Sequence, residues 1–217
     1  MSLRLILKAT APALVLAAIS LVHSVPAAAA GDPARGQTLG YTCLGCHGID
    51  TYKNVYPTFS VPRLRGQHEN YLVTALKAYR NGERSHGTMH AQASSLSDQD
   101  IDDIAAYLSG QAVPHDANAK AAGPVPPLAT STCQTCHGPL GVPDRGQQET
   151  GVATLAGQHA DYLVFALESY RNGSRKNGLM QPFAAQLTPA DIQALATFYS
   201  QQTPALQTVP LKEGKSK

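Results

Sequence analysis

The 217-residue sequence contains no segment in which basic residues are concentrated, apart from the short C-terminal stretch "LKEGKSK". Recognition of nucleic acid needs such a basic footprint, so we expect no nucleic-acid partner. Beyond the first thirty residues the chain also lacks an apolar run of membrane-spanning length and any convincing strand pattern. These absences favour an all-α protein.

The first thirty residues form the only long apolar segment of the sequence. Arg4 and Lys8 precede an apolar run that ends in small residues, which is typical of a secretory signal peptide cleaved near Ala30. An uncleaved membrane anchor is the alternative, but Pro12 and Pro26 interrupt the run. We therefore expect a soluble, exported mature chain with 15 basic and 15 acidic residues, because cleavage removes two of the 17 basic ones.

Cysteine is scarce, and its four copies fall into two pairs that are each followed at once by histidine. In this motif two thiols about one helical turn apart attach one haem, and the adjacent imidazole faces the iron. A zinc ribbon is the alternative, but its two cysteine pairs are usually much closer than the 90 residues seen here. We predict two covalently bound haem c groups, attached through the motifs "CLGCH" and "CQTCH", which comprise Cys43, Cys46, His47, Cys133, Cys136 and His137.

The sequence repeats itself at an offset of 91 residues. The block 66–87 is identical to the block 157–178 at 14 of 22 positions, and the similarity continues to the next helix. Two copies of this length predict a tandem pair of small domains, joined by a segment rich in proline, alanine and glycine. The predicted division is a signal peptide at 1–30, domains at 31–110 and 127–205, a linker at 111–126 and a flexible tail at 206–217.

Each copy predicts two clear helices. Apolar residues recur at helical spacing over 67–80 and again 91 residues later, and each run closes with Asn-Gly. The last helix of each copy has a capping-box signal, at Ser97 and at Thr188, with aspartate three residues further on. Pro33 can open a helix before the first haem motif, whereas several prolines before the second predict a less regular entrance.

Methionine is also rare, with three copies, of which Met1 belongs to the signal peptide. Met89 and Met180 lie 42 and 43 residues after the motif histidines, whereas His86 and His90 align with asparagine and glutamine in the second copy. These histidines remain alternatives for the first haem, and a methionine can also simply fill a gap in a core. The axial ligands we predict are His47 with Met89 and His137 with Met180.

Two filled axial positions leave no open iron site for oxygen or peroxide chemistry, and a neutral thioether raises the haem potential. The predicted protein is therefore an electron carrier and not an enzyme. Two further repeated features have more than one interpretation. His68 and His159 fit helix capping or solvent exposure better than contact with haem propionates, and Tyr79-Arg80 and Tyr170-Arg171 fit either packed helix ends or propionate donors.

Together, the signal peptide, the two haem motifs, the downstream methionines, the "GQ" blocks and "LSDQDI"/"LTPADI" resemble the dihaem cytochrome c4 family over nearly all of 31–203. The resemblance implies tandem class I cytochrome c domains about a pseudo-twofold axis, with propionates close together at the interface. It also implies a periplasmic monomer, at times loosely associated with the membrane surface, that passes electrons from a redox protein donor to a terminal oxidase.

The resemblance assigns haem attachment and axial ligation to the cysteines, histidines and methionines named above. The family usually has a proline before the "GQ" block whose carbonyl steadies the proximal histidine. Pro62 fits this role in the first domain, but Ala153 takes its place in the second. We therefore expect a less rigid ligand at the second haem and unequal potentials.

Two functions remain as alternatives. A dihaem peroxidase has a similar number of motifs, but it needs one haem with a displaceable ligand. A dedicated redox subunit of a larger periplasmic dehydrogenase could have a nearly identical sequence.

Overall fold

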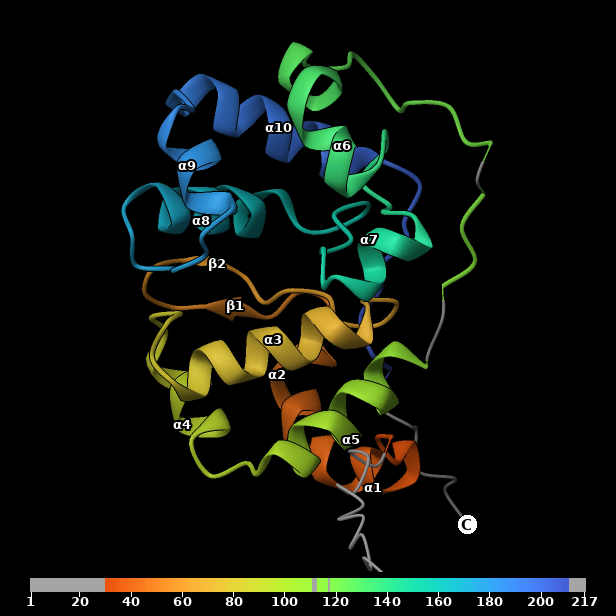
Figure 1. Cartoon of the computed structure of the whole chain (residues 1–217), viewed down its shortest axis with the longest axis vertical. Helices are drawn as coiled ribbons and strands as arrows, with labels where there is room; N and C mark the ends of the chain where they lie inside the picture. The colour runs from red at the N-terminus through yellow and green to blue at the C-terminus, as the bar shows by residue number, and fades with distance from the viewer. Residues whose placement is uncertain (1–29, 111–112, 117, 211–217) are drawn as a thin grey trace, which may run out of the picture.

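The protein consists of two helical halves stacked on each other, as a computed structural model shows for residues 30–110, 113–116 and 118–210 (Figure 1). The predicted signal peptide lies outside the described residues, except for Ala30. The connection between the halves runs along one side of the molecule (Figure 1). The all-α fold class is confirmed, whereas the predicted boundaries between the two domains and the linker stay a prediction.

The N-terminal half contains helices α1 to α5 and the hairpin. Its elements are α1 (Pro33–Leu39), the 3₁₀ turn η1 (Gly40–Cys43), α2 (Leu44–His47), β1 (Lys53–Asn54), β2 (Phe59–Ser60), α3 (Glu69–Arg80), α4 (Gly87–Ala93) and α5 (Asp98–Ser109). The first haem motif therefore spans the end of η1 and the whole of α2.

The C-terminal half repeats this order with a changed entrance and with a short helix, α7, in the place of the hairpin. Its elements are the π-helical turn η2 (Ala129–Cys133), α6 (Gln134–His137), α7 (Arg145–Glu149), α8 (Ala160–Arg171), α9 (Met180–Ala185) and α10 (Pro189–Gln201). Within the described residues no counterpart of α1 precedes η2, so the less regular entrance predicted from the prolines is confirmed.

The predicted helices form where their start signals place them. The side chains of Ser97 and Thr188 cap α5 and α10, and the aspartate three residues on closes a capping box in both. The apolar stripes of these helices then meet α3 and α8. The two cores have these buried members: Leu44, Leu72, Ile104, Ala105, Leu108 and Val209 in the first half, and Ala129, Leu163, Leu195, Ala196, Phe198 and Tyr199 in the second.

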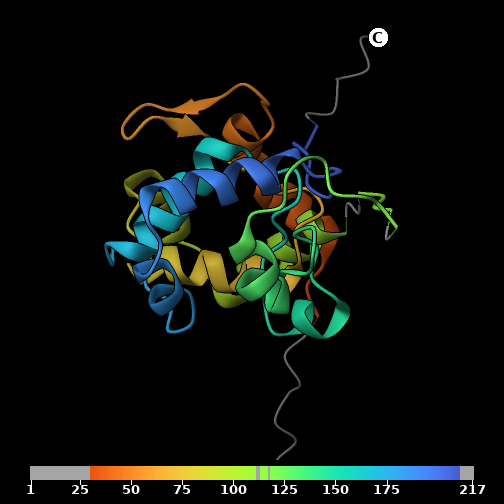
Figure 2. The ribbon, with the colours of Figure 1, turned by 90° about the horizontal axis from the view of Figure 1, so that it is seen from above.

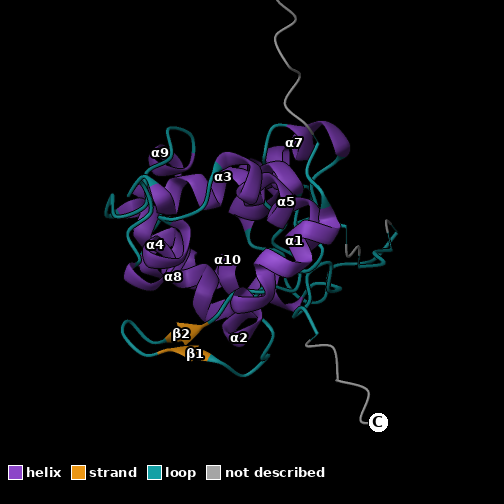
Figure 3. Ribbon diagram, turned by 90° about the horizontal axis from the view of Figure 1, so that it is seen from below, coloured by secondary structure: helices purple, strands orange, loops and turns teal. Residues whose placement is uncertain are grey.

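A small hairpin was not predicted, because the sequence shows no strand pattern there. Strands β1 and β2 are antiparallel, but each is only two residues long, which is too short to show an alternating pattern. The hairpin lies at the edge of the molecule (Figures 2 and 3). It packs on the other half, since Phe59 stacks on Phe165 at 4.1 Å and Asp161 accepts hydrogen bonds from Ser60 and Lys53.

The two halves exchange equivalent contacts across their interface. Gln67 donates to the carbonyl of Thr154 at 3.1 Å and accepts from its backbone N–H at 2.9 Å. Gln158, 91 residues after Gln67, makes the same two bonds with the backbone of Arg63, at 3.0 and 2.9 Å. A twofold relation requires this reciprocity, so the pseudo-twofold arrangement is confirmed.

The segment after α10 does not behave as a flexible tail from residue 206, where we predicted the tail to begin. Leu206 and Val209 are completely buried, and Val209 belongs to the core of the N-terminal half. Gln207 pairs with Arg65 through two backbone hydrogen bonds. The chain therefore returns to the first half through residue 210, and the rest of the predicted tail lies outside the described residues.

Among the described residues, no helix combines the length and the apolar character needed to cross a bilayer. The only apolar segment of comparable length in the sequence is the predicted signal peptide.

An acid-sensitive cluster joins α1 to α5. Arg35 pairs with both Asp100 and Asp103. The capping bonds from Ser97, followed by the bond from Arg35, lower the pKa of Asp100 to about 2. A depressed carboxyl pKa stabilises the fold above the unfolded value near 4, and this contribution is lost as the pH falls towards 2. Replacing Asp100 with Asn should therefore lower the free energy of unfolding at pH 7, with a difference from wild type that shrinks between pH 4 and pH 2.

Denaturant titrations of the haem-loaded protein at several pH values would measure this difference. Asp191→Asn is the matched control, because Asp191 makes the same capping bonds to Thr188 without an arginine partner, so its effect at pH 7 should be smaller. A pH-independent difference for Asp100→Asn would contradict the assignment.

Candidate haem sites

One cavity of about 550 Å³ extends between the two halves and reaches both haem motifs. It is lined largely by apolar side chains of α3, α5, α8 and α10, with contributions from the hairpin. The predicted site residues on its wall are Cys43, Cys46, His47, Met89, Cys133, His137 and Met180. Cys136 is half-buried and is not among the lining residues. The fold thus brings together residues that lie up to 137 positions apart.

His47 is held in one orientation by a backbone carbonyl. Its Nδ1 lies 2.8 Å from the carbonyl oxygen of Pro62, and since a carbonyl only accepts, Nδ1 must carry the proton. Burial lowers the pKa of His47, so the ring is neutral and Nε2 keeps a free lone pair. A neutral imidazole with its other nitrogen donating to a carbonyl is the form that ligates a metal.

His137 has the same geometry in the second half. Its Nδ1 lies 2.8 Å from the carbonyl oxygen of Ala153, and burial lowers its pKa as well. The replacement of proline by alanine therefore leaves the length of this hydrogen bond unchanged. This distance therefore shows no looser hold on the second histidine. Unequal redox potentials of the two haems stay a prediction.

The cysteines are placed to attach a porphyrin. Within the described residues all four thiols are free, and burial raises the pKa of Cys43 and Cys133. The short helices α2 and α6 separate the two thiols of each pair by about one turn and place the histidine directly after the second. Two thiols and a neutral imidazole in each half, beside one shared apolar cavity, fit a covalently bound haem.

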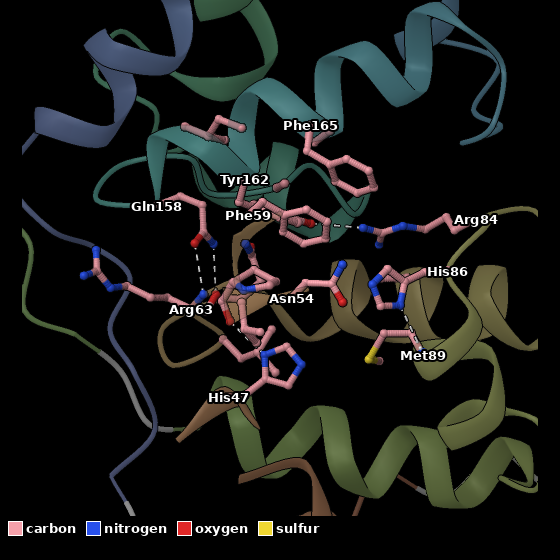
Figure 4. Close-up of a pocket in the computed structure, with 18 of the residues that line it drawn as sticks. His47, Asn54, Phe59, Arg63, Arg84, His86, Met89, Gln158, Tyr162 and Phe165 are labelled. Atoms are coloured by element: carbon pink, nitrogen blue, oxygen red, sulfur yellow. Dashed lines mark hydrogen bonds between the residues drawn. The ribbon is translucent and has the colours of Figure 1, made fainter. Parts of the chain in front are cut away.

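Met89 and Met180 occupy equivalent places at the start of α4 and α9, and both line the cavity. In Figure 4 the sulfur of Met89 and the ring of His47 face the same space. In each half the residue three positions before the methionine caps its backbone N–H, His86 through Nδ1 at 3.2 Å and Asn177 through Oδ1 at 2.9 Å. The repeat therefore preserves the methionine and its capping interaction.

The two competing histidines are engaged elsewhere. Because His86 accepts a hydrogen bond at Nδ1, its proton sits on Nε2, and neither nitrogen offers a lone pair to a metal (Figure 4). His90 is exposed, bonds through Nδ1 to the carbonyl of Tyr79 at 2.9 Å and does not line the cavity. Both observations favour Met89 as the partner of His47.

The structure separates the interpretations left open for the other repeated residues. His68 and His159 occupy N-cap positions, but neither side chain makes a capping bond; Nε2 of His68 bonds instead to Thr154 of the other half at 2.7 Å. Arg80 bonds to the carbonyl of Leu96 at 3.0 Å, away from the cavity, so it packs a helix end. Tyr79 does line the cavity.

Two arginines that line the cavity were not identified as site residues from the sequence. Arg84 and Arg175 are buried, lie 91 residues apart and pair with each other through a backbone bridge between the halves. The only sequence signal was their repetition within "NGERS" and "NGSRK", which by itself does not distinguish a buried arginine from a surface one.

Two helical halves, each with a cysteine pair followed by a carbonyl-oriented histidine that lines one shared cavity, define a tandem c-type cytochrome. The sequence profile of cytochrome c matches residues 33–112, and that of subunit III of cbb3-type cytochrome c oxidase matches residues 126–198. The two profiles coincide with the two copies of the repeat.

Similar proteins support the same class. Cytochrome c4 of Pseudomonas aeruginosa is 36% identical over 78% of this chain and 88% of its own length. The crystal structure of reduced recombinant cytochrome c4 from Pseudomonas stutzeri, 32% identical, superposes with a TM-score of 0.62 over 80% of this chain and all of that one. A thiosulfate dehydrogenase electron acceptor of Stutzerimonas stutzeri is 33% identical over 73% of this chain and 77% of its own length.

The chain belongs to the cytochrome c4 family. It is a dihaem electron-transfer protein, and its two cysteine pairs bind two haem c groups covalently.

Proposed function

We propose that this protein carries single electrons in the periplasm from respiratory redox proteins to a terminal oxidase and that it has no catalytic activity of its own. The observation that supports the proposal is the pairing, in each half, of a histidine with a free Nε2 lone pair and a methionine on the wall of the same cavity. We assign His47 and Met89 as the axial ligands of the first haem and His137 and Met180 as those of the second.

The side chains around each site favour fast electron exchange over substrate chemistry. When bound, the haem iron supplies a one-electron ferric–ferrous couple. The carbonyls of Pro62 and Ala153 fix the imidazoles, and the capping bonds at Met89 and Met180 fix the methionine backbones. His47 with Met89, and His137 with Met180, would hold each haem iron through fixed side chains, so the bound haem would exchange an electron with little rearrangement and would offer no open position to a substrate.

Exposed apolar side chains near the cavity support docking of a redox partner. Val55 and Tyr56, at the tip of the hairpin, line the cavity and are 85% and 94% exposed. These two adjacent side chains offer a partner protein an apolar contact area. We assign the hairpin side of the first half as one place where a partner approaches.

The test is a turnover measurement with the purified haem-loaded protein. The reduced protein is mixed with membranes of the source organism that contain a terminal oxidase, and its reoxidation is followed by absorbance. We expect oxidation that stops when cyanide blocks the oxidase, and no peroxide consumption by the protein alone. Peroxide turnover without membranes would support the peroxidase alternative and overturn the proposal.

A second candidate function is that of a dedicated electron acceptor for a dehydrogenase, and the similarity to thiosulfate dehydrogenase electron acceptors favours it. The same preparation distinguishes the two. Reduction by thiosulfate together with a thiosulfate dehydrogenase, without reoxidation by membranes, would assign the protein to that enzyme. Rapid reoxidation by membranes would assign it to the oxidase.

A further inference from the structure

Arg84 and Arg175 form a buried cluster on the pseudo-twofold axis. They are 7% and 8% exposed and pair as an antiparallel backbone bridge. The flanking backbone bonds, from Ser85 to Ser174 at 2.9 Å and from Lys176 to Glu83 at 2.7 Å, also connect the two halves. The two arginines therefore come from equivalent positions in the two halves, and both line the shared cavity.

Each guanidinium group is held by tyrosines of both halves. Arg84 stacks on Tyr79 of its own half, and Arg175 stacks on Tyr170, both at 4.3 Å from the ring centroid. Arg84 then donates to the hydroxyl of Tyr162 in the second half at 3.1 Å (Figure 4). Arg175 donates to the hydroxyl of Tyr71 in the first half at 2.9 Å. Each arginine is thus fixed by the opposite half.

The cluster has two positive charges and, among the residues that the structure describes, no acidic partner. None of the ion pairs among the described residues includes Arg84 or Arg175. The buried Nε of Arg175 has no hydrogen-bond partner within the described part of the chain. Although burial raises the pKa of Tyr71, the nearby charges of Arg175 and Arg84 lower it to about 8. Buried cations without an anion are unfavourable, so we expect carboxylate groups to accept hydrogen bonds from these two arginines.

We propose that Arg84 and Arg175 bind the propionates of the two haems. Since each arginine is also held by a tyrosine of the opposite half, the redox potential of each haem then depends on both halves. Both arginines line the cavity that reaches both haem motifs, and a guanidinium group matches a carboxylate through two parallel hydrogen bonds. A positive charge at the propionates favours ferrous iron. Because each arginine is fixed by a tyrosine of the opposite half, removing one of them changes the surroundings of both haems.

Redox titration of the haem-loaded Arg84→Gln and Arg175→Gln proteins tests this inference. We expect each substitution to lower both midpoint potentials, with the ferrous-to-ferric ratio at a fixed potential falling about tenfold, or about 59 mV for one electron. Arg80→Gln is the matched control, because it also removes one positive charge but lies outside the cavity. Its midpoint potentials should change much less.

The inference is wrong if Arg84→Gln binds both haems and leaves both potentials unchanged, or shifts them no more than Arg80→Gln. If the glutamine variants lose haem, Tyr162→Phe removes only the hydroxyl that holds Arg84; it should lower both potentials by a smaller amount, and no shift would overturn the inference. These potentials are measured in the absence of any redox partner. The outcome is therefore independent of whether the electrons go to an oxidase or come from a dehydrogenase.

Discussion

Replacement of Met89 with Ala is expected to remove the sixth ligand of the first haem and leave the second haem unchanged. The weak red absorption band of the oxidised protein, which reports sulfur-to-iron ligation, should lose about half of its intensity. The midpoint potential of one haem should fall by roughly 100 mV or more, since axial ligands set haem potentials over a range of about 0.8 V. Spectroelectrochemical titration of the purified protein measures both effects.

Met180→Ala is the matched variant in the second half and should remove the other half of the band. His86→Ala is the control for the competing ligand, because His86 caps Met89 through Nδ1 and should not ligate the iron. A band that survives in Met89→Ala, or disappears in His86→Ala, would show that the assignment of the first axial ligand is wrong. An iron that is already five-coordinate in the wild type would favour an enzyme over a carrier.

Replacement of both Cys133 and Cys136 with Ser is expected to leave one covalently bound haem per chain and to unfold much of the second half. The core of that half is built around the cavity, since Leu163, Leu195 and Tyr199 belong to the core and also line the cavity. An unfilled cavity of even one large side chain costs about 3–5 kcal/mol, and the free energy of unfolding of a whole domain is about 5–15 kcal/mol. An empty site of porphyrin size is therefore expected to cost more than the free energy of unfolding of this half, so this half should fold only when its haem is bound.

The covalent haem content is measured by haem staining of the denatured chain, and folding by amide hydrogen exchange. The paired control is the chain with Cys43→Ser and Cys46→Ser, which should retain the second haem and lose protection in the first half. Equal protection of both halves in either variant would show that the halves fold without their haems. Two covalent haems in the Cys133→Ser, Cys136→Ser chain would contradict the attachment site.

The sequence alone was sufficient for features that depend on local chemistry. The haem motifs were recognisable because the two thiols and the histidine of each lie within five residues. The capping boxes at Ser97 and Thr188 and the apolar periodicity of α3 and α8 were recognisable for the same reason. The 91-residue repeat added a comparison within the chain, and it separated Met89 and Met180 from the neighbouring histidines.

Other features depend on contacts between distant residues, and these were missed or left open. The hairpin β1–β2 is too short to show a strand pattern, and its Phe59 is fixed by packing on the other half. The chain after α10 looked like a tail, yet Val209 completes the core of the first half. His68, expected to cap a helix or face solvent, bonds instead across the interface.

Local residue chemistry therefore determined that this chain is a tandem protein with two haem attachment sites, because each motif is complete within a few residues. Only the tertiary structure decided that the two sites share one cavity and that Arg84 and Arg175 meet on its axis. The physical reason is that the burial and the partners of a charged side chain depend on the residues around it. For these two arginines, those residues come from parts of the chain about ninety residues apart.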